Sequence, residues 1–209
     1  MRRLLNITLA CALALSVTLA AAPKFVSTWK APEAANVSFA GKKVAALIVT
    51  DDQSLQMSGE EALVRELAAV GLPNGISSIR IVPREELRDP EKARGWYEKQ
   101  NVDGVVAMRL VKTDTRKTWT PVTWTSPTYS SFWGYYGYSW SSLNEAGYLR
   151  EDAVVVVETL VFSVPMNKLL WAGVTESTNP KDVQRGIRDI VKATVKEMQK
   201  HGLARKAVR

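Results

Sequence analysis

The sequence predicts a single α/β domain, with helices packed on one mixed central sheet of about five strands. Strand-like and helix-like segments alternate through the first half, which favours crossover connections and a partly parallel sheet. Two adjacent strand-like segments follow, and an amphipathic segment ends the series, giving the order β-α-β-α-β-β-β-α. The 209 residues suffice for one domain with a real core, which we place at residues 23–202.

The first half begins with residues 27–32, which we interpret as an edge strand that ends at Pro32. Residues 42–50 form a short apolar run, typical of a buried strand. Ser58 and Glu61 have the spacing of a capping box, which predicts that a helix begins there. We expect that helix to end at a glycine, Gly71.

The next segments predict two more strands with a helix between them. Ile79 and Ile81 flank a polar residue and predict the second strand of the series. Residues 84–101 predict helical turns, interrupted at Asp89, which precedes a proline. Residues 104–111 predict the third strand.

The second half predicts a hairpin and a final helix. Residues 153–162 form the most apolar strand-like segment, and a turn at Asn167 leads into residues 169–177. Asn179 is the expected N-cap of the last helix, which ends at Gly202. The apolar stripe of that helix consists of Val183, Ile187, Ile190, Val191, Thr194, Val195 and Met198.

An aromatic-rich insertion, residues 119–150, separates the third strand from the hairpin. Ten of the chain's 17 aromatic residues lie between Trp119 and Tyr148, among Ser, Thr, Gly and Pro. Their spacing follows neither a strand nor a helix period cleanly, so we expect no regular element there.

Three interpretations of the insertion stay open. The insertion is a β-hairpin extension whose rings pack on each other and on the sheet, the rings form an exposed binding platform, or they anchor the protein at a membrane interface. Tyr and Trp among small polar residues are typical of binding loops, and stacked rings suit sugars or a protein partner. The candidate binding residues are Trp124, Tyr129, Phe132, Trp133, Tyr135, Tyr136, Tyr138 and Trp140.

The N-terminus has the layout of a secretory signal peptide, which we place at residues 1–22. Arg2 and Arg3 precede an apolar run, and three alanines close it. The run is too short for a comfortable membrane span. The expected location is therefore the bacterial periplasm.

Cys11 is the only cysteine of the chain and raises lipidation as an alternative. Ala10 fits the box that precedes a lipidated cysteine in bacterial lipoproteins, whereas Leu9 and Thr8 do not. If the signal peptide is removed, no thiol remains for disulfides or catalysis. Membrane association is expected only if Cys11 is lipidated or the signal peptide stays uncleaved.

Charge gives no sign of nucleic-acid binding. The formal net charge is +7, and removing Arg2 and Arg3 leaves 26 basic against 21 acidic residues, or +5. Part of this excess lies in a basic tail, residues 203–209. We see no basic stripe on an ordered segment, so we expect no nucleic-acid partner.

Common catalytic and metal chemistry lacks the residues it needs. His201 is the sole histidine and lies at the expected end of the last helix, where a cation favours the helix dipole. A zinc site, a Ser-His-Asp triad and a phosphate-binding glycine loop all lack their usual residue sets. We therefore predict no cofactor, no metal site and no catalytic residue.

Two glutamates of the predicted hairpin keep a hydrolase as an alternative. If the hairpin turns near Asn167, Glu158 and Glu176 face one another across the strands. Paired carboxylates serve glycosidases. Either glutamate can instead pair with Arg109 of the third strand, as a charge cluster on the sheet.

Several segments together resemble a family of bacterial envelope proteins and lipoproteins, known chiefly as a domain of unknown function. The resemblance covers nearly all of the mature chain, and its most distinctive segments are FWGYYGY and LLWAGVTESTNP. It implies a fold similar to small periplasmic α/β domains such as the N-terminal domain of TolB. Members usually have a better lipidation box than the one at Cys11, and the resemblance brings no catalytic residues.

These observations predict a non-enzymatic envelope protein that binds a protein partner or a cell-wall glycan through its aromatic segment. The alternatives are a carbohydrate-active hydrolase that uses the paired strand glutamates and a purely structural envelope domain. The sequence does not define an oligomeric state.

Overall fold

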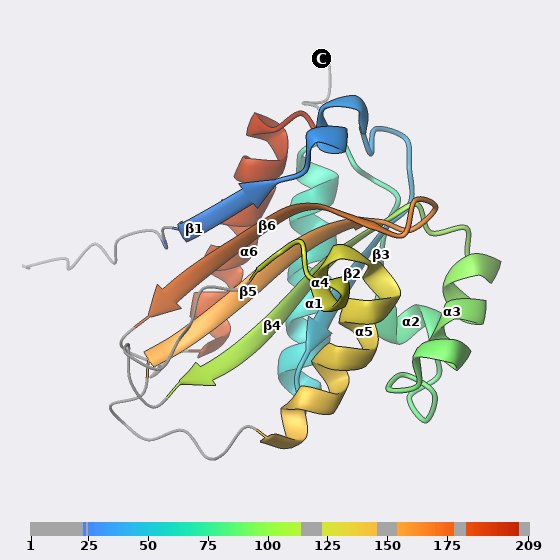
Figure 1. Cartoon of the computed structure of the whole chain (residues 1–209), viewed down its shortest axis with the longest axis vertical. Coiled ribbons are helices and arrows are strands. Elements are labelled where there is room, and N and C mark those ends of the chain that lie inside the picture. Colours follow the sequence, from blue (N-terminus) through green and yellow to red (C-terminus); the bar gives the residue numbers. More distant parts are fainter. Residues whose placement is uncertain (1–22, 24, 114–122, 146–153, 178–182, 205–209) are drawn as a thin grey trace, which may run out of the picture.

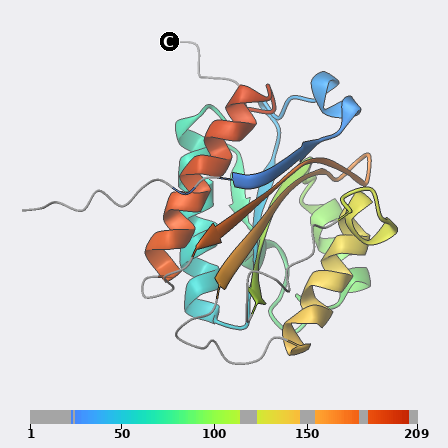
Figure 2. The same ribbon diagram turned by 60° about the vertical axis from the view of Figure 1, so that its left-hand side comes forward.

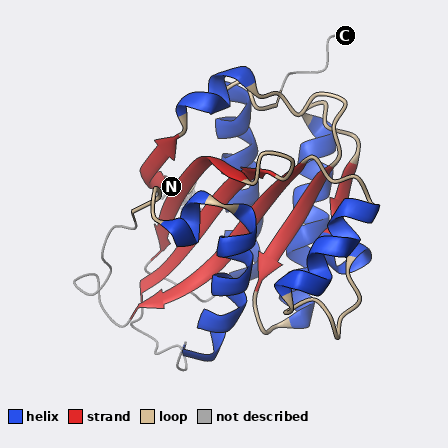
Figure 3. Ribbon diagram, turned by 45° about the vertical axis from the view of Figure 1, so that its right-hand side comes forward, coloured by secondary structure: helices blue, strands red, loops and turns tan. Residues whose placement is uncertain are grey.

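A computed structural model describes residues 23, 25–113, 123–145, 154–177 and 183–204 of the chain (Figure 1). The described residues form one six-stranded sheet with helices on both of its faces (Figures 2 and 3). The predicted signal peptide with Cys11, the aromatic residues Trp119 and Tyr148, the cap at Asn179 and residues 205–209 of the tail lie outside the described residues.

The sheet has the strand order β1-β6-β5-β4-β2-β3 and is mixed. β2 pairs in parallel with β3 and β4, and the other neighbours are antiparallel. This architecture confirms the predicted mixed α/β class. The strands are β1 (Phe25–Lys30), β2 (Val44–Val49), β3 (Gly75–Ser77), β4 (Gly104–Thr113), β5 (Val154–Ser163) and β6 (Lys168–Ser177).

The helices divide between the two faces of the sheet, as Figure 2 shows. One face carries the two long helices, α1 (Gln53–Ala69) and α6 (Val183–Lys200). The other face carries α3 (Pro90–Lys99) and α5 (Phe132–Ser141), with the short helices α2 (Ser78–Ile81) and α4 (Pro127–Ser130). Two short 3-10 helices, η1 (Pro32–Asn36) and η2 (Ser142–Glu145), complete the described elements.

Each face has its own hydrophobic core. We call the core under α1 and α6 the aliphatic face and the core under α3 and α5 the aromatic face. On the aliphatic face, Leu63 and Leu67 of α1 and Val191 of α6 are fully buried against the sheet. On the aromatic face, Tyr97, Phe132 and other rings are fully buried. Because side chains alternate along a strand, neighbouring residues of the central strands contribute to opposite cores.

The first long helix begins earlier than the sequence predicted. Asp52 is the N-cap of α1, and its carboxylate accepts a hydrogen bond from the Leu55 N–H at 3.0 Å. Ser58 lies inside the helix, where its hydroxyl donates to the Leu55 carbonyl. The capping-box prediction was therefore wrong in position, because a stronger cap lies two turns upstream. The predicted end is confirmed, since Gly71 follows the helix with a positive φ of 93°.

The second predicted strand was wrong in its residues. The strand β3 covers Gly75–Ser77 only, and Ile79 and Ile81 belong to the short helix α2. Ser78 explains the change of direction, because its buried hydroxyl donates to the Ala46 carbonyl of β2 at 2.7 Å. A side chain thereby takes the place of the next backbone bond of the ladder.

The remaining predicted elements are confirmed within the described residues, except that residues 84–88 form turns and no helix. Asp89 caps α3 by accepting from two backbone N–H groups, and Pro90 is its first residue. β5 and β6 form the expected hairpin, and Asn167 adopts a left-handed conformation at its turn. β1 is the edge strand expected before Pro32, and α6 ends just before Gly202, whose φ is 78°.

Candidate functional site

The aromatic insertion forms regular structure on the face of the sheet opposite α1 and α6. Residues 132–141 fold as the helix α5, after the short helix α4. The Ser131 hydroxyl caps α5 by accepting from the Gly134 N–H at 3.1 Å. The prediction that no regular element exists there was wrong for these residues, and so was the β-hairpin interpretation, because the segment is helical.

Most of the eight predicted binding rings are buried. Phe132, Tyr135 and Tyr136 have no exposed surface, and Trp140 keeps 3%. Trp124 and Tyr129 are also buried, Trp133 is partly buried, and Tyr138 is the exposed member of the set. The exposed-platform interpretation is therefore corrected for six of the eight, because these rings pack on one another and on the sheet.

A helical period in the insertion was the signal that sequence reasoning missed. The buried positions of α5 are Phe132, Tyr135, Tyr136, Ser139 and Trp140. They follow the spacing i, i+3, i+4, i+7 and i+8 of an amphipathic helix. Glycines, Trp133 and Tyr138 lie between them and obscured this pattern, since these intervening residues are not polar enough to contrast with the buried ones.

Beneath α5 lies a buried ion pair between neighbouring strands. Arg109 of β4 and Glu158 of β5 are direct cross-strand partners. The guanidinium donates to Oε2 of Glu158 from Nη2 at 2.9 Å and from Nε at 3.2 Å. Arg109 is 6% exposed and Glu158 1% exposed. The interpretation of Glu158 as the partner of Arg109 is thus confirmed.

The aromatic insertion encloses this ion pair. The Tyr129 hydroxyl donates to Oε1 of Glu158 at 3.3 Å and accepts from Arg109 at 3.2 Å. Arg109 also donates to the Ser142 hydroxyl, and its guanidinium carbon lies 4.8 Å from the centre of the Tyr138 ring. Burial raises the pKa of Tyr129 and of Tyr135, so both hydroxyls stay protonated and neutral.

The predicted facing of Glu158 and Glu176 was wrong. Val174 lies opposite Glu158, and Glu176 lies opposite Val156, because the pairing register is shifted by two residues from the one that the sequence analysis assumed. The two glutamates lie on the same face, but as diagonal neighbours. The arginine and the tyrosine already donate to both oxygens of Glu158, which leaves it poorly placed to transfer a proton.

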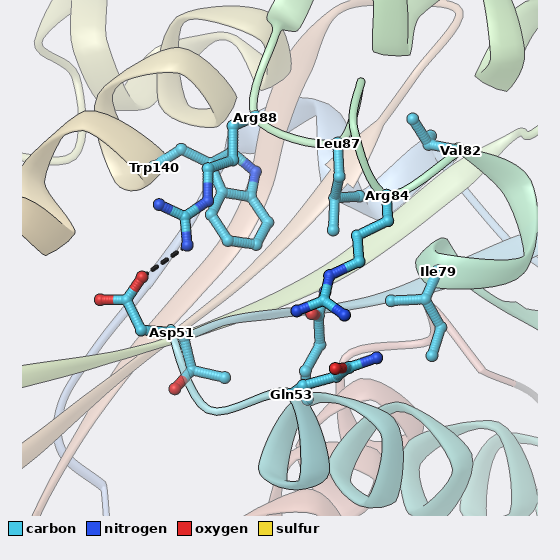
Figure 4. A pocket seen from close by; sticks show the side chains of 10 residues that line it. Asp51, Gln53, Ile79, Val82, Arg84, Leu87, Arg88 and Trp140 are labelled. Carbon is cyan, nitrogen blue, oxygen red and sulfur yellow. Dashed lines mark hydrogen bonds and ion pairs between the residues drawn. The ribbon is translucent and has the colours of Figure 1, made fainter.

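A pocket of about 220 Å³ lies outside the carboxyl ends of β2 and β3 (Figure 4). Helices leave these two parallel strands toward opposite faces of the sheet, since α1 follows β2 and α2 follows β3. Crevices of this kind are where open α/β sheets usually bind ligands. The lining residues are Thr50, Asp51, Gln53, Gln56, Ile79, Val82, Arg84, Leu87, Arg88 and Trp140.

Polar groups from three segments converge on this crevice pocket. Asp51 and Gln53 flank the start of α1, and Arg84 and Arg88 come from the loop after α2. Arg88 donates to Asp51 at 2.5 Å, as the dashed line in Figure 4 shows. The same guanidinium lies 5.7 Å from the centre of the Trp140 ring. Trp140 is thus the ring of the insertion that reaches the crevice pocket.

A second buried carboxylate, Glu60 of α1, lies behind the crevice pocket. Oε1 accepts from the Ile48 N–H and from Nε2 of Gln56, each at 3.2 Å, and Oε2 accepts from the Ile79 N–H at 3.1 Å. The carboxylate therefore bonds backbone groups of β2 and α2 just past the point where the β2–β3 ladder ends. Burial raises the pKa of Glu60 to about 7, although all three donors favour its charged form.

Neither of these sites was named as functional by the sequence analysis. The crevice pocket depends on the parallel pairing of β2 with β3, and β3 was predicted at the wrong residues. Asp51 directly after an apolar strand was the available signal, since loops at carboxyl ends of parallel strands carry ligand sites.

Among the described residues, no group of three or more His, Cys, Asp or Glu side chains is placed to hold a metal ion. Within the same described ranges, no helix has both the length and the apolar character needed to cross a membrane.

Comparisons with known proteins give little. No protein-family model matches the chain, and no curated protein matches it. Two solved structures of the PelC dodecamer from Paraburkholderia phytofirmans, one of them a point variant, are similar, each with a TM-score of 0.43. The variant is 15% identical over 85% of this chain and 98% of that chain; the other is 14% identical over 86% and 97%. At this level the likeness carries no argument about function.

Proposed function

We propose that the protein is a non-enzymatic protein of the bacterial periplasm that recognises a small polar ligand, a unit of a cell-wall glycan, in the crevice pocket. The single observation that carries this proposal is the convergence of Asp51, Gln53, Gln56 and Arg84 on a pocket outside the carboxyl ends of β2 and β3. Placed polar groups beside apolar walls, here Ile79, Val82 and Leu87, are typical of small-molecule sites. The signal-peptide pattern of the N-terminus supports the location.

The crevice pocket is a better recognition surface than the aromatic insertion. Rings without exposed area have no face on which a sugar or a partner can stack, which applies to Phe132, Tyr135 and Tyr136. Trp140 contributes a pocket wall and helps to hold Arg88. The insertion therefore serves recognition indirectly, by completing the crevice pocket.

Recognition without catalysis is favoured by the state of the carboxylates. Asp51, the acidic residue among those that line the crevice pocket, is paired with Arg88. Glu158 is enclosed by Arg109 and Tyr129. A glycosidase needs two carboxyl groups on either side of the scissile bond, and these side chains offer no such pair to a common ligand.

Calorimetry with soluble cell-wall fragments tests the proposal. We expect the wild-type protein to bind muropeptides saturably and Gln53→Ala to weaken binding about tenfold, because a hydrogen bond to the ligand is lost. Gln53 is exposed, so the fold should survive the change. Arg65→Ala is a matched control, since Arg65 is exposed on the same helix about 18 Å further along its axis. Equal affinities for Gln53→Ala and Arg65→Ala, or no saturable binding by wild type, would contradict the proposal.

A further inference from the structure

The charges of the crevice pocket do not cancel. Its ionisable lining residues are Asp51, Arg84 and Arg88. Asp51 and Arg88 neutralise each other through their ion pair. Arg84 has no ion pair or side-chain hydrogen bond to any residue that the structure describes, and Figure 4 shows its guanidinium directed toward Gln53 at the start of α1. One positive charge is therefore left for a ligand.

The start of α1 adds to this positive potential. The first N–H groups of a helix have no intrahelical acceptor, and the helix dipole favours negative charge there. Asp52 occupies part of this end, because its carboxylate bonds the Leu55 N–H. The N-terminus alone is thus no anion site, and the guanidinium of Arg84 is the group that makes the crevice pocket attractive to a carboxylate.

A largely buried side chain on the pocket wall offers an acceptor to ligand hydroxyl groups. Gln56 is only 6% exposed, yet it lines the crevice pocket. Its Nε2 donates to Glu60, which fixes the amide and leaves Oε1 without a hydrogen-bond partner among the described residues. Oε1 can only accept, and a ligand hydroxyl group can donate to it in place of water. The Asp51 carboxylate is a second acceptor on the wall.

The size of the crevice pocket limits the ligand further. Pockets for drug-sized ligands measure about 300–1,000 Å³. A pocket of about 220 Å³ suits a smaller group, such as a single sugar ring.

We infer that the crevice pocket selects an acidic sugar, a single ring that carries one carboxylate and several hydroxyl groups. This inference rests on the proposed function. Arg84 binds the carboxylate through two parallel N–H donors, the geometry that guanidinium and carboxylate groups favour. Gln53, Gln56 and Asp51 bind the hydroxyl groups. A second negative charge on the ligand has no unpaired cation to meet, which disfavours a phosphate dianion.

Calorimetric titration of the full protein with D-glucuronate, D-glucose and inorganic phosphate tests this assignment. We expect wild type to bind glucuronate at least tenfold more tightly than glucose or phosphate, with an affinity that falls as salt is raised. Arg84→Gln should bring glucuronate and glucose to equal affinity. Arg65→Gln, which removes an exposed charge from α1 outside the crevice pocket, should leave the preference unchanged. Circular dichroism of each variant checks that the fold is kept.

The other outcomes separate this inference from the proposed function. Equal affinity of wild type for glucuronate and glucose overturns the selection of an acidic sugar and leaves glycan recognition standing. Phosphate binding as tight as glucuronate binding overturns it in favour of a general anion site. An unchanged preference in Arg84→Gln shows that another group reads the carboxylate and also overturns it. Absence of binding to any sugar, muropeptides included, removes both proposals.

Discussion

The two faces of the sheet solve the same packing problem with different side chains. The aliphatic face is covered by two long helices that bury Leu, Ile and Val, and the aromatic face is covered by shorter helices that bury Tyr, Trp and Phe. Each side also has a buried glutamate. Glu158, under the aromatic helix, is neutralised by Arg109, whereas Glu60 of α1 is held by N–H donors alone.

We therefore interpret the aromatic face as structural support and the crevice pocket as the proposed recognition site. The buried polar groups of the aromatic face bond one another, because Arg109, Glu158 and Tyr129 form mutual hydrogen bonds beneath α5. The edge of the sheet beside Glu60 presents polar side chains to a ligand, because the short strand β3 leaves a crevice past its end. We therefore expect substitutions in the aromatic cluster to change stability and substitutions in the crevice pocket to change binding.

Glu158→Ala should be the most damaging change in this comparison. It leaves the buried Arg109 charge without its partner, which typically costs about 3–5 kcal/mol. Urea unfolding measures the loss. Replacing both residues together, as Arg109→Met with Glu158→Leu, should recover most of it, because no unpaired charge remains. A loss below about 1 kcal/mol for Glu158→Ala would show that the pair is solvated in solution.

Removing a buried ring should destabilise the protein by as much as Glu158→Ala or less. Phe132→Ala should lower the free energy of unfolding by about 3–5 kcal/mol, because Phe132 is fully buried. Tyr138→Ala, at a position that is 38% exposed on the same helix, should cost clearly less. Thermal or urea unfolding of the two variants compares them directly. Equally small losses of unfolding free energy in both variants would show that the Phe132 ring is exposed in solution.

Glu60 predicts a pH dependence of stability with a defined sign. Its folded-state pKa of about 7 lies above the ordinary glutamate value of 4.5, so the native state binds more protons between these values. The associated stability is fully present below about pH 4.5 and is lost as pH rises through about 7, up to roughly 3 kcal/mol. Unfolding free energies from pH 4 to 8 measure it, and Glu60→Gln should flatten the curve relative to wild type. Parallel curves for the two proteins would show that Glu60 titrates normally.

Much of the fold was predictable from the sequence because it follows regular patterns. The strand β2 is a continuous apolar run, β5 and β6 are two strand-like segments joined by a short turn, and α6 has an apolar stripe at helical spacing. The start of α1 was misplaced because Asp52 competes with Ser58 as a cap, and β3 because Ser78 ends it after three residues. Both depend on hydrogen bonds that local spacing does not show.

The candidate site was harder to predict than the fold. Arg109 was recognised as a possible partner of Glu158, because both lie at alternating positions of adjacent strands. The crevice pocket, in contrast, unites the end of β2, the loop after α2 and a tryptophan of α5. Segments so far apart in the sequence meet only through the parallel pairing of β2 with β3. The number of aromatic rings led to the prediction of a binding surface, whereas the helical spacing of the rings indicated that they are buried.

Chemical-shift mapping by NMR is the most direct test of the central claim, that recognition takes place in the crevice pocket and not on the aromatic insertion. Isotope-labelled protein is titrated with muropeptides, and the amide signals that move are assigned. The account predicts the largest shifts in segments 50–56 and 79–88, which contribute most of the lining residues of the crevice pocket. Largest shifts around Trp133 and Tyr138, with the signals of residues 50–56 unmoved, would contradict it.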